Sequence, residues 1–347
     1  MTIFVLGYPS DMGGANVELF ATVRLWRAHG LDVALIPTWT ASPIWQERLD
    51  AIGCQTVTDV NHHPLLIMPQ SVGTKIVLPK NSIVVAFGNF HLLQLAGQLR
   101  EQNCRIVYVP CMSTPCDQDC KFHEAGLQCD EYVFQSSFQF TQYAHLLNEV
   151  PDARCHPIHG AFDPTEFPFA PRPHEPGEPF WAGRMSRPDL KKYSRHLWNA
   201  YRPVPNIRAR IMAWSGPLGK HCGEPPDWAV MLTKRTEPAQ KFYRHLHAII
   251  HPTGESPENW PRFVLEAMSA GVPIITDNRG GVLEMIHDGQ TGFLCDSPEQ
   301  MAEVATELAN DEFYRMQIAH AARKRVEQLT NPDVIWAGWE KVFKEVV

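Results

Sequence analysis

Two glutamates on either side of a predicted helix start are the strongest candidates for chemistry in this sequence. Glu258 lies in a polar loop, and Glu266 follows eight residues later, in the first turns of a helix expected to begin near Arg262. The first backbone N–H groups of a helix have no intrahelical partners, so this helix start is a natural site for a diphosphate. A carboxylate on each side can hydrogen-bond to a polyol. The segment is therefore predicted to bind a diphosphate that joins two polyols.

Both glutamates also have an ordinary explanation. Glu258 fits a solvated loop charge, and Glu266 fits a charge that the helix dipole favours near an N-terminus. Their spacing alone does not distinguish a functional role from an ordinary one, because glutamates eight residues apart arise by chance in a chain of ordinary composition. The surrounding sequence has to decide between these interpretations.

The elements around these residues read as two α/β domains. An apolar strand over 3–7, a helix over 15–29 and a strand over 32–37 begin a doubly wound sheet, and Leu19, Val23 and Trp26 give the helix an apolar face. Further strands are expected at 75–78, 82–86, 105–109 and 132–134, with helices at 92–102 and 137–148. After residue 179 we expect strands at 180–182, 207–211, 228–232, 248–250 and 273–276, and helices at 238–246, 262–270 and 298–308.

A proline-rich stretch separates the two halves. Eight prolines lie between Pro151 and Pro179, where an extended backbone without N–H donors suits a connection. We expect a Rossmann-like domain over 1–168, a second over 169–330, and a final helix over 331–347 with Trp336 and Trp339 on one side. Two such domains face a central cleft, and ligands bind there at the carboxyl ends of the strands.

Composition excludes several classes of function. Of 347 residues, 31 are Lys or Arg and 38 are Asp or Glu, and no basic run occurs, which argues against nucleic acid or an anionic membrane surface as a partner. No stretch approaches the roughly 18 apolar residues of a membrane span, and no signal peptide is evident, so we expect a cytosolic protein. Most of the nine cysteines are expected to be free thiols. The cluster Cys111, Cys116, Cys120 and Cys129 with His123 leaves zinc open as an alternative.

The segment with the two glutamates resembles the Glu-x7-Glu signature of retaining GT-B glycosyltransferases of family 4, the glycosyl transferases group 1. EAMSAGVPII, from Glu266, resembles the family's EAMA-G-PVV segment, and GGVLEMIHDGQTGFL, from Gly280, resembles GG-E-I--G-TGFLV. HGAFDPTEF over 159–167 resembles NGVD---F, and Gly13-Gly14 resembles the N-terminal glycine loop. The similarity extends over nearly the whole chain and is strongest over 250–295.

The resemblance implies roles for these residues. Glu266 would bind the ribose diol of a donor nucleotide, and Glu258 would contact the hydroxyls of the donor sugar. The other implied donor-site residues are Asn259, Arg262 and the amides of Phe263, Val264 and Leu265. Gly13, Gly14 and Asn16 would line an acceptor or phosphate loop, although Asn16 also fits a helix-face or cap position.

The family also has an Arg…Lys pair that clamps the diphosphate, and Arg184 matches its arginine. The lysine usually follows after five residues, but position 189 is Asp here, so Lys192 is the first choice and Lys191 the second. Two such cations would stabilise a leaving diphosphate without a metal or another cofactor. Many family members carry a first-domain histidine near the sugar, and Cys111 stands where it would be expected.

The resemblance implies the GT-B fold, in which the last helix crosses back onto the first domain, and Trp336 and Trp339 would anchor that crossing. It also implies a retaining, metal-independent glycosyltransferase of the hexosyltransferase type. It would move a sugar from a nucleotide diphosphate sugar, expected to be UDP-linked, to a sugar, lipid-linked or small-molecule acceptor. The leaving phosphate would take the acceptor proton in a front-face substitution. Three alternatives stay open: a glycoside hydrolase that uses the two glutamates as acid and base, a nucleotide-sugar epimerase on the same fold, and a catalytically silent nucleotide-sugar-binding subunit.

Overall fold

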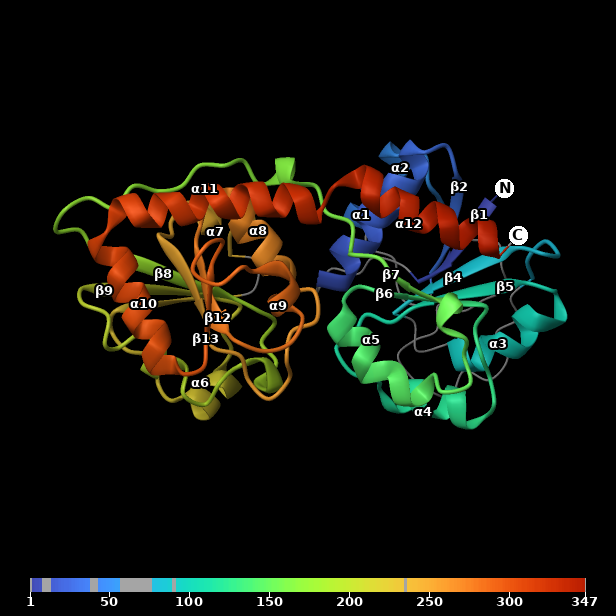
Figure 1. The fold of residues 1–347 in the computed structure, drawn as a ribbon, viewed down its shortest axis with the longest axis horizontal. Helices are drawn as coiled ribbons and strands as arrows, with labels where there is room; N and C mark the ends of the chain where they lie inside the picture. Colours follow the sequence, from blue (N-terminus) through green and yellow to red (C-terminus); the bar gives the residue numbers. More distant parts are fainter. Residues whose placement is uncertain are drawn as a thin grey trace. The chain divides into compact units, whose positions relative to one another are not determined.

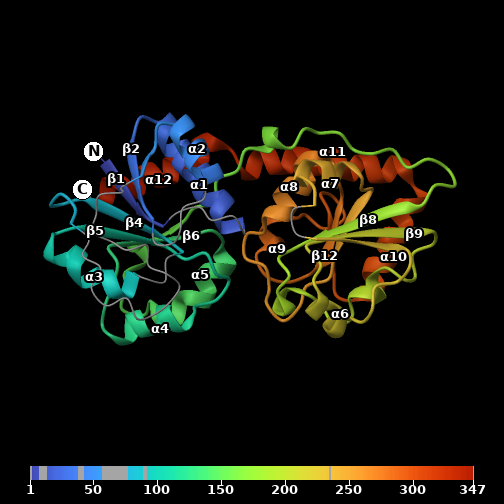
Figure 2. The ribbon, with the colours of Figure 1, turned by 180° about the vertical axis from the view of Figure 1, so that it is seen from behind.

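The chain of this computed structural model divides into two units, each built on one parallel sheet (Figure 1, and from behind in Figure 2). The structure describes residues 2–7, 14–37, 43–56, 77–88, 92–233 and 236–346, and only the backbone of residues 92–94. The first unit comprises Met1–Phe162 and Asn331–Val347, and the second comprises Asp163–Thr330. The sequence prediction placed the boundary after residue 168, whereas the segment from Asp163 onward packs with the second unit.

The described part of the first unit contains a seven-stranded sheet in the order β3-β2-β1-β4-β5-β6-β7, with every pair parallel. Helices bury both faces of this sheet, which is why its central strands are apolar along their length. Its strands are β1 (Thr2–Leu6), β2 (Asp32–Ile36), β3 (Gln55–Thr56), β4 (Ile83–Phe87), β5 (Arg105–Val109), β6 (Glu131–Phe134) and β7 (Cys155–Pro157). Its helices are α1 (Gly14–Ala28), α2 (Pro43–Ala51), α3 (Leu92–Glu101), α4 (Asp117–Glu124) and α5 (Ser137–Tyr143).

The second unit repeats this plan with six strands among its described residues, in the order β10-β9-β8-β11-β12-β13. Helices α7, α8 and α11 lie together on one side in Figure 1. The strands are β8 (Phe180–Met185), β9 (Ile207–Met212), β10 (Ala229–Leu232), β11 (Ala248–His251), β12 (Ile274–Asp277) and β13 (Phe293–Cys295). The helices are α6 (Gly216–Cys222), α7 (Ala239–Arg244), α8 (Arg262–Ala270), α9 (Val282–Met285), α10 (Pro298–Asn310) and α11 (Glu312–Leu329).

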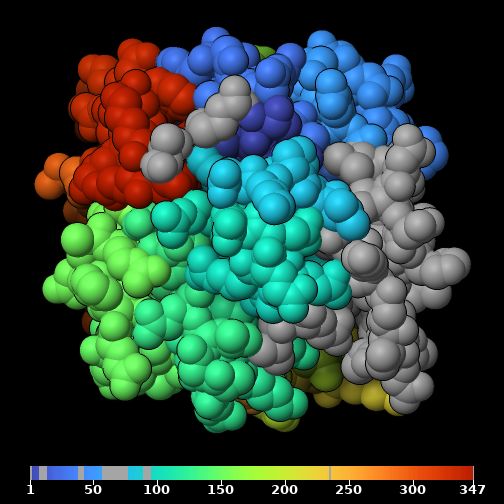
Figure 3. All heavy atoms as spheres, turned by 90° about the vertical axis from the view of Figure 1, so that its right-hand side faces the viewer, coloured from blue at the N-terminus to red at the C-terminus, as the bar shows by residue number. Residues whose placement is uncertain are grey.

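The last helix, α12 (Pro332–Glu345), returns to the first unit, as the sequence predicted. Figure 3 shows its red atoms beside the blue atoms of the N-terminal elements. The ring of Trp339 meets Trp26 of α1 edge-on with centroids 4.7 Å apart, and Phe343 meets the same ring at 5.2 Å. Trp336 stacks on His29 at 4.2 Å. These aromatic contacts supply the apolar area that holds a helix distant in sequence against α1.

A polar contact fixes the other end of α12. Nε2 of buried His156, on β7, lies 2.6 Å from Oε2 of Glu131 on β6 and 3.3 Å from Oε2 of Glu345 in the last turn of α12. One imidazole N–H thus faces two carboxylates. The contact joins the end of the chain to the edge of the first sheet.

Most predicted elements are confirmed. Helix α8 has the predicted bounds, and the strands expected at 3–7, 32–37, 82–86 and 105–109 correspond to β1, β2, β4 and β5. The strand expected at 75–78 is wrong at Val77 and Leu78, which lie outside any strand, while residues 75 and 76 lie outside the described residues. Helix α11 was missed: Ile318, Ala322, Val326 and Leu329 recur at helical spacing, but the many alanines and charged residues make this apolar stripe weak. In the part of the chain that is described, no helix has the length and hydropathy of a membrane span.

The docking of α12 predicts a large difference between two substitutions on this helix. Trp339→Ala should lower the free energy of unfolding by about 3–5 kcal/mol, because it removes a buried ring that is 2% exposed. Val334→Ala is the matched control on the same helix, since Val334 is 66% exposed, and it should change stability by less than about 0.5 kcal/mol. Chemical denaturation measures both. Equal effects would contradict the described docking.

Candidate functional site

The loops that follow β8 and β11 meet where the strand order of the second sheet reverses. These two strands are adjacent and parallel, with Ala248 opposite Ala182. In open α/β sheets, ligands bind beyond the carboxyl ends of the strands at such a reversal. Here the loops carry Lys191 and Lys192 after β8, and Glu258 and Asn259 after β11. The position in the fold alone thus makes this the first place to look for a site.

Backbone contacts lock the two loops together. The N–H of Gly254 donates to the carbonyl of Lys192 at 3.2 Å, and the N–H of Ser256 donates to the carbonyl of Lys191 at 3.0 Å. A Cβ at Gly254 would lie 2.7 Å from the carbonyl oxygen of Tyr193. Only glycine allows this close approach. The loop after β11 is therefore held at a fixed distance from the segment that carries the lysines.

The structure separates the two candidate lysines. Nζ of Lys192 lies 2.7 Å from Oε2 of Glu258, and both side chains are largely buried, at 18% and 12% exposed. Lys191 is exposed, and its side chain takes no part in this ion pair. Of the two positions considered from the sequence, Lys192 is the one that the fold brings to Glu258.

Arg184, at the end of β8, is completely buried. Its guanidinium lies 3.6 Å from the centre of the Tyr193 ring, and Nη2 donates to the carbonyl of Lys192. Nε and Nη1 have no hydrogen-bond partner among the described residues. A buried cation with unused donors is costly for folding. Such a group is expected where an anion is to be bound.

His251 is a functional candidate that the sequence analysis did not single out. It ends β11, is completely buried, and stacks on Phe263 with ring centroids 3.9 Å apart. Burial, together with the nearby Arg184, lowers the pKa of His251 to about 3, so the ring is neutral at physiological pH. Its place directly after an apolar strand, where an aliphatic residue would be ordinary, was the available signal.

Nε2 of His251 lies 3.8 Å from Oε1 of Glu258. That separation is beyond hydrogen-bonding distance, so the contact is electrostatic. Burial by itself would raise the pKa of Glu258, but the proximity of His251 and the ammonium group of Lys192 outweigh it and hold the pKa at about 2. Glu258 is therefore a carboxylate throughout the physiological range.

The start of α8 lies beside these side chains, since Phe263 in its first turn stacks on His251. Pro261 precedes the helix, no side chain caps the N-terminus, and the first turn carries no acidic residue. Arg262, Phe263, Val264 and Leu265 form this turn and are all buried. An uncapped N-terminus without a neighbouring carboxylate favours an anion. The geometry fits the diphosphate expected from the sequence.

Two glycines hold the loop of Glu258 and Asn259 from the other side. Gly280 has φ +80°, and a Cβ there would lie 2.6 Å from the carbonyl oxygen of Glu258. The N–H of Gly281 donates to the same oxygen at 2.8 Å. A side chain at Gly281 would overlap the backbone of buried Asn259. The paired glycines thus place the loop that carries Glu258.

Glu266 lies further along α8 and is half-buried. The hydroxyl of Tyr243, on α7, donates to its Oε2 at 2.9 Å. Desolvation raises the pKa of Glu266 to about 7, against the lowering effects of Arg262 and of the Tyr243 hydrogen bond. A carboxylate in such a place costs folding free energy when ionised. This cost is typical of a group kept for binding.

The first-unit candidates are only partly described. Gly13 lies outside the described residues, Gly14 begins α1, and Asn16 is half-buried in the first turn of that helix. Glu18 is buried rather than on a solvated face: Nε2 of Gln135 donates to its Oε1 at 2.6 Å. Gln135 directly follows β6, so this carboxylate lies at the carboxyl edge of the first sheet. The sequence pattern did not identify it.

The structure answers the question about the cysteines. All nine are free thiols. Among the described residues, two groups of side chains lie close enough together to hold a metal ion, and neither group contains a cysteine. In the described structure, Cys111, Cys116, Cys120, Cys129 and His123 therefore do not converge as a set of metal ligands.

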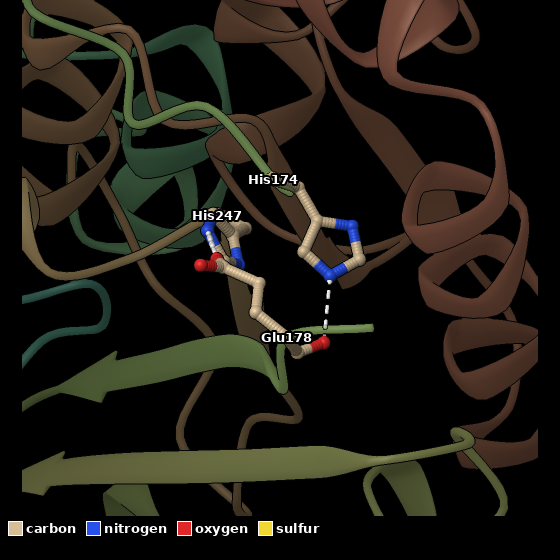
Figure 4. Close-up of side chains that lie close together, drawn as sticks. All are labelled: His174, Glu178 and His247. Carbon is tan, nitrogen blue, oxygen red and sulfur yellow. Dashed lines mark hydrogen bonds and ion pairs between the residues drawn. The ribbon is translucent and has the colours of Figure 1, made fainter. Parts of the chain in front are cut away.

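One convergent group is His174, Glu178 and His247, which lie close together in Figure 4. Nδ1 of His247 accepts the N–H of Trp181 at 3.0 Å, so in the neutral ring Nε2 carries the proton and faces Oε1 of Glu178 at 2.9 Å. Burial lowers the pKa of His247 to about 3, which keeps the ring neutral. A metal would need a free electron pair on the protonated nitrogen. The same Nε2 lies 3.2 Å from the carbonyl oxygen of Pro173, so its proton is directed at protein acceptors and the group does not fit a metal site.

Residues 229–325 match the family described as Glycosyl transferases group 1. The capsular polysaccharide biosynthesis glycosyltransferase CapM of Staphylococcus aureus is 32% identical over 116 residues, which are 33% of this chain and 30% of CapM. Glycogen synthase of Mycobacterium tuberculosis is 27% identical over 186 residues, 49% of this chain and 43% of that protein. The chain thus spans less than half the length of these curated relatives.

Solved structures match over the whole chain. The Anabaena protein Alr3699/HepE in complex with UDP-glucose superposes with a TM-score of 0.75 at 16% identity, covering 99% of this chain and 100% of that one. Sucrose-phosphate synthase from Thermosynechococcus elongatus gives 0.74 at 15% identity, covering 100% and 99%. The chain has the GT-B fold. The α/β class, the two Rossmann-like domains and the returning last helix that the sequence predicted are thereby confirmed.

The raised pKa of Glu266 predicts a pH-dependent effect on stability. Because the folded protein holds this proton up to about pH 7, against 4.5 for an ordinary glutamate, Glu266 lowers stability progressively as the pH rises through this interval. Glu266→Gln should therefore unfold like the wild type near pH 4.5 and be more stable, by about 1–3 kcal/mol, near pH 8. Denaturant titrations at the two pH values measure this.

The matched control is Glu303→Gln, because Glu303 is exposed on α10, and no such pH-dependent gain is expected for it. An equal gain in both variants would show that net charge and not burial of Glu266 is the cause.

Proposed function

We propose that the protein is a retaining glycosyltransferase that moves a sugar from a nucleotide diphosphate sugar to an acceptor hydroxyl. One observation carries the proposal: Arg184 is a fully buried cation with two unpartnered nitrogens in the described structure, beside Lys192 and the uncapped start of α8. Three anion-attracting groups at the strand-order reversal suit a diphosphate. The match of residues 229–325 to Glycosyl transferases group 1 supports the same conclusion.

In this proposal, the donor lies along the loops that follow β8 and β11. Glu266 accepts hydrogen bonds from the ribose diol, and Glu258 and Asn259 contact the sugar. The amides of Phe263, Val264 and Leu265 hold phosphate or sugar oxygens. UDP is the proposed nucleotide; the similar Anabaena structure was solved with UDP-glucose.

The proposed chemistry needs no protein nucleophile and no metal. Negative charge develops on the leaving diphosphate as the sugar departs, and the fixed cations Arg184 and Lys192 stabilise that charge. The same phosphate takes the proton of the acceptor hydroxyl, so the new bond forms on the face from which the nucleotide leaves. Glu258, ionised at physiological pH, positions the sugar. The proposed acceptor is a sugar, a lipid-linked molecule or a small molecule, with Gly13, Gly14 and Asn16 as the candidate acceptor-loop residues.

A thermal-shift panel with UDP, GDP, ADP and dTDP tests the donor site. A nucleotide at about 100 times its Kd adds about 2.7 kcal/mol, or roughly 5–10 °C in Tm for a protein of this size. We expect a shift with UDP that Glu266→Ala abolishes. No shift with any nucleotide would contradict the proposed function. Turnover of plain glycosides would favour a hydrolase, and interconversion of UDP-sugars without acceptor would favour an epimerase.

The two neighbouring lysines give a matched pair of variants. Lys192→Ala should weaken UDP binding by about 10–100-fold, because it removes a charge-assisted contact and leaves Glu258 to repel the diphosphate. Lys191→Ala should change binding by less than about threefold, because its side chain is exposed. Calorimetric titration with UDP measures both. If Lys191→Ala were the weaker binder, the assignment of the diphosphate clamp would be wrong.

Retention of the anomeric configuration is tested on the reaction product. The anomeric configuration of the transferred sugar, read by NMR, should equal that of the donor. Inversion would contradict the proposed mechanism and leave the donor site intact.

A further inference from the structure

His251 is buried without a hydrogen-bond partner on either ring nitrogen in the described structure. A buried polar group in this state costs folding free energy, so its retention calls for an explanation. The ring is also held firmly: it stacks on Phe263 with an interplanar angle of 16°, and the His251 carbonyl accepts the hydroxyl of Thr276 at 3.0 Å. The unpaired nitrogens therefore belong to a ring with a fixed orientation.

The ion pair beside this ring is incompatible with the roles proposed for its two members. Lys192 holds Glu258 at 2.7 Å, whereas the proposed function directs Lys192 to the diphosphate and Glu258 to the sugar. An incoming diphosphate carries more negative charge than the carboxylate and attracts the ammonium group away from it. Glu258 would then lose its counter-charge in a position where its side chain is only 12% exposed. That loss is costly unless another donor replaces the ammonium group.

We propose that His251 is the replacement: a positioning residue whose Nε2–H takes over Glu258 when the donor diphosphate draws Lys192 away. The gap of 3.8 Å between Nε2 and Oε1 of Glu258 closes to a hydrogen bond with a movement of about 1 Å. In the free protein the carboxylate of Glu258 pairs with Lys192, and in the complex it accepts a hydrogen bond from His251. The inference rests on the proposed function for the identity of the ligand.

The charged groups around His251 give the exchange a direction. Arg184 faces the ring from the end of β8, Lys192 from the segment after it, and Glu258 from the loop after β11, while α8 contributes the apolar ring of Phe263. Asp277, at the end of β12, is engaged by Thr253. A bound diphosphate would offset the two cations and leave Glu258 in place. Binding therefore leaves Glu258 without its ammonium partner, and the Nε2–H of His251, 3.8 Å from Oε1, is the neighbouring donor that can replace it.

Histidine-selective 15N NMR tests the exchange directly. The ring signals of His251 are assigned as those missing in His251→Gln. They should shift when UDP is added to the wild type, and they should already be shifted in Lys192→Met without any nucleotide, because Glu258 has then lost its ammonium partner. Unchanged His251 signals in Lys192→Met would overturn the inference. The Lys192→Met measurement does not depend on nucleotide binding. It therefore distinguishes failure of the proposed exchange from failure of the proposed function.

A kinetic comparison distinguishes positioning from packing. His251→Leu keeps a similar volume without a donor, and His251→Gln offers an amide N–H. With a UDP-sugar donor, the leucine variant should lose about 10–100-fold in kcat with UDP affinity within about threefold of the wild type. The glutamine variant should recover most of that loss. Equal kcat values for the two variants would overturn the inference, and the NMR result decides the matter if His251→Leu fails to fold.

Discussion

The adjacency of β8 and β11 is the constraint on which the candidate site depends. Where the strand order of the second sheet reverses, the chain leaves these two neighbouring strands in opposite directions around the sheet, and their loops are left facing one another. That arrangement brings Lys192 to Glu258 across a sequence separation of 66 residues. Gly254 lets the two backbones touch, and Gly280 and Gly281 hold the loop from the far side. Each of these features serves the same pair of side chains.

Histidine and arginine side chains differ in hydrogen bonding between the two ends of the second sheet. At the end where β8 and β11 begin, the nitrogens of His174 and His247 all face acceptors or donors, and buried Arg315 donates to the carbonyls of Arg172 and His247. At the carboxyl end, Arg184 and His251 are equally buried yet keep nitrogens without partners in the described structure. Polar groups satisfied by the protein stabilise the fold, and groups left unsatisfied are available to a ligand. The contrast between these histidines and arginines is consistent with a structural cluster at one end of the sheet and the candidate site at the other.

Three side chains of the candidate site in the second unit cost folding free energy. Arg184 is a buried cation with unused donors, His251 is neutral because burial and Arg184 disfavour its charge, and Glu266 resists ionisation up to about pH 7. Each is less favourable in the free protein than it would be in water, and an anionic, hydroxyl-bearing ligand would relieve each of them. Clustering of shifted pKa values with unpaired donors is typical of functional sites.

The sequence by itself determined the α/β fold class with its two Rossmann-like halves, and it predicted a site in the segment around Glu258 and Glu266. These follow from local patterns: apolar runs of strand length, a helix start after a polar loop, and Pro-rich chain between the halves. The expectation of a returning last helix came from the resemblance of the sequence to a known family. Only the tertiary structure showed that Lys192 pairs with Glu258, that His251 lies beside Glu258, and that Glu18 is buried against Gln135. Such contacts join residues far apart in the chain, and no local spacing encodes them. Burial, which sets the charge states of His251 and Glu266, likewise arises only when the sheets and helices pack together.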